Sequence, residues 1–149
     1  MANFLTQGRT ALLDALKDDA QIAALVKTWV EFGPGLQRRF QFEPAACPLL
    51  ALSPADGNAL RMANALTDIT QRLRIELATD GQDAEPVEAL VSLVIERLKA
   101  SAASCLGLAE DGLAGIEVEG IAWRPLPDAT GARVMWTARI SVALLWKRL

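Results

Sequence analysis

The sequence predicts an α+β fold, with N-terminal helices, a mixed or antiparallel β-sheet of about four strands, one long helix packed on one face of the sheet and a C-terminal β-hairpin. Two segments alternate between apolar and polar residues, as half-buried strands do, and they span residues 70–79 and 133–147. Between them, residues 83–107 carry apolar side chains at the spacing of one helix face. A chain of 149 residues is long enough for a single domain, residues 1–149, with a hydrophobic core.

The first part of the chain predicts two helices. The first helix buries an apolar face formed by Leu12, Leu13 and Leu16. Asp19 is a good N-cap for a second, shorter helix, because its carboxylate accepts hydrogen bonds from the free N–H groups of a first turn. Residues 33–35, Gly-Pro-Gly, end this helix. Its apolar positions are Ile22, Leu25, Val26 and Trp29.

Two segments in the middle of the chain, residues 36–46 and 54–67, are predicted to be partner-facing loops. They are longer than the usual connection of about four to six residues, and long ordered loops often bind partners. Residues 36–43 also fit a short edge strand, whereas residues 54–57, Pro-Ala-Asp-Gly, are typical of a turn. A solvated loop without a partner is the alternative for both segments. The candidate contact residues are Arg38, Arg39 and Arg61.

The long helix is predicted to cover the sheet. Asp83 is its expected N-cap, Pro86 lies in its first turn and Gly107 is its expected end. A short apolar run, residues 47–53, adds a buried strand. The predicted core residues are Leu73, Ile75, Leu77, Val91, Val94, Leu98, Ile140 and Val142.

The C-terminal hairpin combines a rising strand, residues 115–124, with the closing strand. Gly120, near the middle of the rising strand, predicts a β-bulge. The closing strand is longer than the usual strand of about five or six residues. A strand of this length can extend past its own sheet and pair with a neighbouring subunit.

The opposite face of the predicted sheet is polar and is a second candidate for partner binding. Arg72, Arg74 and Glu76 alternate with the apolar positions of one strand. Arg139 lies on the polar face of the closing strand. Arginine is enriched at interfaces, so a subunit or partner contact is one interpretation and a solvent-facing sheet is the other. Trp146, near the chain end, is a further candidate interface residue.

Composition excludes several classes of protein. Hydrophobic residues make up 52% of the chain and the net charge is −3, with scattered basic residues. Tight nucleic-acid binding is therefore excluded, although a protein that surrounds nucleic acid without gripping it is not. No apolar run approaches the roughly 20 residues of a membrane span. The apolar excess indicates a large subunit interface, with a well-filled monomer as the alternative.

No catalytic, cofactor-binding or metal-binding residue is predicted, and we do not expect an enzyme. The chain has no histidine and no tyrosine, which removes the commonest general base and metal ligand. Cys47 and Cys105 are isolated, and we expect both to be buried free thiols of a cytosolic chain rather than a zinc site. Glu117 and Glu119 share one strand face, which gives too few oxygen donors for a metal.

Along the chain, a helical start is followed by a short apolar strand after Cys47 and Pro48, a long strand ending in Leu73-Arg-Ile-Glu-Leu77, an acidic turn, a helix over residues 85–106 and a terminal hairpin. This order of elements resembles the tail-terminator (tail-completion) proteins of long-tailed bacteriophages. Residues 11–20, Ala-Leu-Leu-Asp-Ala-Leu-Lys-Asp-Asp-Ala, are also similar to the start of many small tail-completion proteins.

This resemblance implies a structural virion protein of the tail or neck, assembled in the host cytoplasm. Such proteins form a homo-oligomer, a hexameric ring that caps the tail tube, stops its polymerisation and joins the tail to the head. The implied partners are the tail tube protein and the head–tail connector or neck protein. DNA passes through the lumen without sequence-specific binding, and no membrane or cofactor is involved. The alternatives are another neck or head-completion protein, or a small ferredoxin-like ligand-binding or enzymatic domain.

Overall fold

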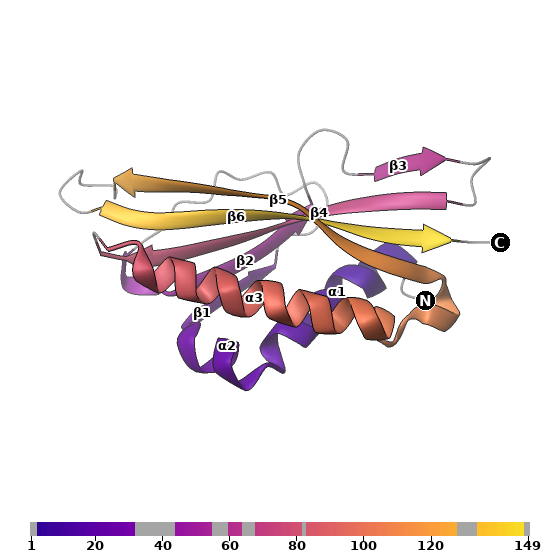
Figure 1. Ribbon diagram of the computed structural model, residues 1–149, viewed down its shortest axis with the longest axis horizontal. Coiled ribbons are helices and arrows are strands. Elements are labelled where there is room, and N and C mark those ends of the chain that lie inside the picture. The colour runs from indigo at the N-terminus through magenta and orange to yellow at the C-terminus, as the bar shows by residue number, and fades with distance from the viewer. Residues whose placement is uncertain are drawn as a thin grey trace.

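A six-stranded sheet runs through the part of the chain that the structure describes (Figure 1). This computed structural model describes residues 3–31, 44–54, 60–63, 68–81, 83–127 and 134–147. Only the backbone is described for residues 60–63 and for Pro44, Arg124, Leu126, Pro127 and Val134. The sheet order is β1-β2-β4-β6-β5, and β3 pairs with β4 outside this path. β1 and β2 are parallel and the other pairs are antiparallel, so the predicted mixed α+β fold is confirmed. The strands are β1 (Thr28–Glu31), β2 (Leu49–Pro54), β3 (Leu60–Ala63), β4 (Asp68–Asp80), β5 (Leu113–Pro127) and β6 (Val134–Lys147).

The two shortest strands correct the sequence-based prediction of about four strands. β1 lies where the sequence predicts that the second helix continues to Trp29, and β3 lies inside the predicted loop 54–67. Each is four residues long, which is too short for the alternation of a strand to be told from a helix or a loop. Pairing with β2 and β4, rather than local sequence preference, decides their conformation.

All the α-helices of the described ranges lie on one face of the sheet (Figure 1). α1 begins where Asn3 Oδ1 accepts a hydrogen bond from the backbone N–H of Thr6 at 2.7 Å. Asp19 caps α2 as predicted, since its Oδ1 accepts from the backbone N–H groups of Gln21 and Ile22 at 3.0 and 3.1 Å. None of these helices is long and apolar enough to cross a membrane. The helices are α1 (Phe4–Lys17), α2 (Ala20–Leu25) and α3 (Glu85–Ser104).

α3 is the predicted long helix, but its ends differ from the prediction. Its N-cap is Ala84, and the Oδ1 of the preceding Asp83 accepts from the first helical N–H at 3.1 Å. The helix ends before Gly107, because Cys105 and Leu106 already have positive φ angles of 50° and 53°. The short 3₁₀ turns are η1 (Pro44–Ala46), η2 (Cys105–Gly107) and η3 (Ala109–Asp111).

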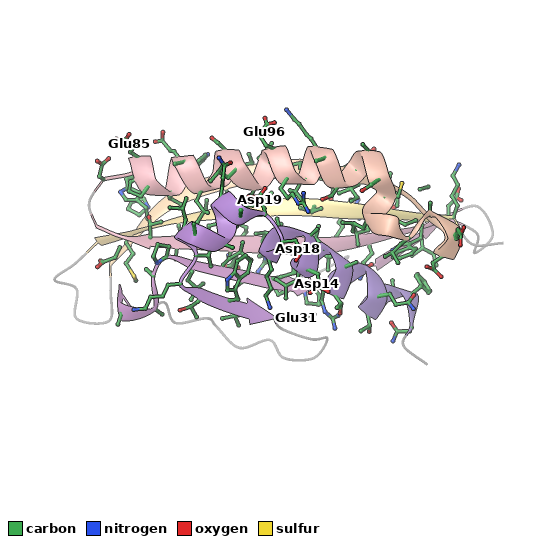
Figure 2. All side chains as sticks on the ribbon, turned by 90° about the horizontal axis from the view of Figure 1, so that it is seen from below. Asp14, Asp18, Asp19, Glu31, Glu85 and Glu96 are labelled. Carbon is green, nitrogen blue, oxygen red and sulfur yellow. The ribbon has the colours of Figure 1, made fainter. Side chains whose placement is uncertain are left out.

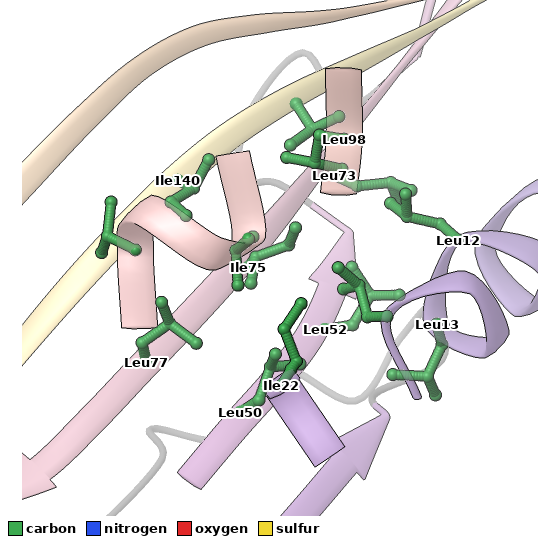
Figure 3. Close-up of a cluster of buried hydrophobic side chains, with 14 of the residues drawn as sticks. Leu12, Leu13, Ile22, Leu50, Leu52, Leu73, Ile75, Leu77, Leu98 and Ile140 are labelled. Atoms are coloured by element: carbon green, nitrogen blue, oxygen red, sulfur yellow. The ribbon is translucent and has the colours of Figure 1, made fainter. Parts of the chain in front are cut away.

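One hydrophobic core fills the space between the helices and the sheet (Figure 3). Every predicted core residue belongs to it, with 4% or less of its surface exposed. The period of two in β4 and β6 directs alternate side chains toward the helices, and the apolar stripe of α3 meets them. The buried residues that α1 and α2 add are Leu12, Leu13, Leu16 and Ile22.

Trp146 lies inside this core, which corrects its predicted role at an interface. Only 1% of its surface is exposed, so almost none of the side chain can contact a partner. Its ring packs edge-on against Phe4 with the ring centroids 5.0 Å apart. This contact packs the end of β6 against α1. Trp146 faces the core because the alternation of β6 places it on the same face as Ile140.

A second, smaller apolar cluster lies on the opposite face of the sheet, at one end. It includes the buried side chain of Cys47, and neither Cys47 nor Cys105 forms a disulfide. Cys105 is only partly buried, which corrects the prediction that both thiols are buried. Burial and the negative charge of Asp80 raise the pKa of Cys47 above its ordinary value. The buried members of the cluster are Cys47, Leu49, Ala51, Ala78 and Met135.

Candidate partner-binding face

Three arginine side chains meet on the sheet face that α1, α2 and α3 leave uncovered. Arg72 and Arg74 come from β4 and Arg139 comes from β6. On β4 these positions alternate with Leu73 and Ile75, which point into the core, so the arginines point away from the helices. The structure thus brings together three residues that the sequence proposes for partner binding.

Two glutamates pair with these arginines. Arg72 Nε donates to Glu119 Oε1 at 2.9 Å. A single oxygen of Glu76, Oε1, lies 3.4 Å from Arg74 Nη1 and 3.6 Å from Arg139 Nη2. The pairs are partly buried, with 16% and 17% of the Arg74 and Glu76 side chains exposed, and the network holds these side chains in position.

A hollow of about 410 Å³ lies among these side chains. The hollow has room because Gly120 of β5 has no side chain and its neighbour on β6, Ser141, has a small one. On the other side of Ser141, the neighbouring residue on β4 is Arg74. A β-bulge between Val118 and Gly120 confirms the predicted bulge. The residues that line the hollow are Arg72, Leu73, Arg74, Glu119, Gly120, Arg139 and Ser141.

The arginine face carries charges of both signs. Three guanidinium groups lie there with the paired carboxylates of Glu76 and Glu119, and Glu117 lies on the same face, opposite Ala143. Guanidinium groups bind carboxylates and phosphates well.

On the helical side, Figure 2 shows the carboxylates of Asp14, Asp18 and Glu96 on α1, on the turn that follows it and on α3. The same helices also carry the basic side chains of Lys17 and Lys99.

The side chains that line the hollow are mostly charged or apolar. Ser141 is the one hydroxyl among the hollow's lining residues, and no histidine exists in the chain to activate it. Within the described ranges, no three histidine, cysteine, aspartate or glutamate side chains gather in a way that could hold a metal ion. The arrangement can bind a charged surface.

The fold has a counterpart among solved structures. The chain matches no protein-family model and no curated protein sequence. It shares its fold with a virion chain. This chain belongs to the structure of the virion of the native gene transfer agent (GTA) particle, with a TM-score of 0.62, 17% sequence identity and 93% of each chain covered. At this identity the likeness establishes the fold.

The remaining predicted contact residues are Arg38, Arg39 and Arg61. Arg38 and Arg39 lie outside the described residues. Arg61 lies on β3 with its backbone opposite Thr70, so it is on a strand and not on the predicted loop. The sequence did not identify Glu119 as the partner of Arg72. The sequence signal for this pair is Gly120, which follows Glu119 and marks the β-bulge, because a bulge changes the direction of the neighbouring side chains.

Proposed function

We propose that this protein is a structural subunit of a phage-like particle, a tail terminator that forms a ring on the end of the tail tube. The observation that carries the proposal is the fold shared with a chain of the GTA virion over 93% of both chains. The order of elements, which resembles tail-terminator proteins, supports the finer assignment. In this role the ring stops polymerisation of the tube and joins the tail to the head, in the host cytoplasm and then in the virion.

A role as one of several identical subunits agrees with the surface of the molecule. The arginine network and the hollow beside it provide a charged face of the kind that contacts protein partners. We propose that the tail tube protein or the head–tail connector binds this face, together with Arg38, Arg39 and Arg61. The net charge of −3 would let DNA pass a ring of these subunits without being held.

We propose further that the protein is not an enzyme and needs no cofactor. The absence of histidine and tyrosine from the sequence supports this, as does the lack of a phosphate-binding glycine motif. A carboxylate pair that performs acid–base catalysis would have to converge in a cleft. The carboxylates of the arginine face instead pair with guanidinium groups.

The mass of the purified protein in solution tests the ring. We expect a discrete species of six times the 16.0 kDa subunit mass, and ring-shaped particles by electron microscopy. A mass equal to one subunit at high concentration and in assembled particles would contradict the proposal. A ring that is found at the head rather than on the tail would identify another neck or head-completion protein.

The contact residues are tested in particle assembly. Replacing Arg38, Arg39 and Arg61 by Glu should leave the fold intact and block tail joining, because the altered charges would repel the partner. Lys99→Glu on α3 is the control, since 71% of that side chain is exposed on the helical side. Infectious particles formed normally by the triple variant would reject these residues as contacts.

A further inference from the structure

We draw no further inference here: the strongest candidate, the row of exposed apolar side chains that Val118, Ile121 and Trp123 form on the edge strand β5, carries no proposal because nothing in the described part of the structure shows what covers it.

Discussion

The indole of Trp146 donates a hydrogen bond from Nε1 to Gln71 Oε1 at 3.0 Å, in the buried part of the molecule. The amide nitrogen of Gln71 donates in turn to the backbone carbonyl of Leu5 at 3.0 Å. One side chain of β4 therefore connects the last strand with the first helix. Because Gln71 is only 6% exposed, water cannot readily replace either bond.

We expect Gln71→Ala to lower the free energy of unfolding by about 2–3 kcal/mol, because it leaves the buried indole N–H without a partner and removes packed atoms. Urea denaturation followed by far-UV circular dichroism measures this. Gln21→Ala, at an exposed position of α2, is the control and should change stability by no more than about 0.5 kcal/mol. An equal effect of the two variants would show that the bridge does not stabilise the fold.

Gly8→Ala tests the packing of α1 on β6. In an ordinary helix this change stabilises by about 1 kcal/mol. Here the added Cβ would lie 2.6 Å from Trp146 Cζ2 and 3.0 Å from Leu144 Cδ1. The Gln71 bond holds the indole in place, so we expect a net destabilisation of about 1–3 kcal/mol from overpacking.

The same contact predicts a rescue. Trp146→Phe removes the indole ring atom that Gly8→Ala would meet, so the double variant should lose less stability than the two single losses added together. Thermal melting of the wild type, Gly8→Ala, Trp146→Phe and the double variant measures this coupling free energy. Additive losses would place the strain of Gly8→Ala somewhere other than Trp146.

Val94→Asp and Ile140→Asp should each prevent folding. Both side chains are fully buried in the core between α3 and the sheet, where an unpaired carboxylate is not solvated. Ser92→Asp, at an exposed position on α3, should remain folded. Soluble variants at both core sites that melt cooperatively would show that the register of the core is wrong.

The stability of the protein should fall at high pH through Cys47. Its pKa is raised in the folded state, mainly by burial and also by Asp80, above the ordinary value of 9.0. The unfolded thiol therefore loses its proton first as the pH rises. The stability contributed by the neutral thiol is complete below pH 9.0 and is lost as the pH rises through the folded pKa.

Comparison with Cys47→Ala isolates this effect, since every other group titrates in both proteins. The difference in unfolding free energy between wild type and variant should be constant up to about pH 8 and should then shift against the wild type, by at most about 1.4 kcal/mol per pH unit. A difference that stays constant to pH 10 would mean that Cys47 ionises equally in both states.

The sequence by itself determined the elements whose pattern is long enough to read. β4 and β6 alternate over 13 and 14 residues and α3 carries its apolar stripe over 20, so their buried faces and the core residues between them follow from periodicity. The same alternation put Arg72, Arg74 and Arg139 on one face. Gly120 marked the bulge, because glycine in a strand weakens regular pairing.

Only the tertiary structure decided the remaining features, because each depends on a partner distant in the sequence. β1 and β3 are strands because β2 and β4 lie beside them. Trp146 is a core residue because α1, from the other end of the chain, covers it with Gly8 and Phe4. Val118 alternates with Glu117 and Glu119 as a core-facing residue would, but it is 40% exposed because β5 is the last strand of the sheet order, and no local pattern records that position.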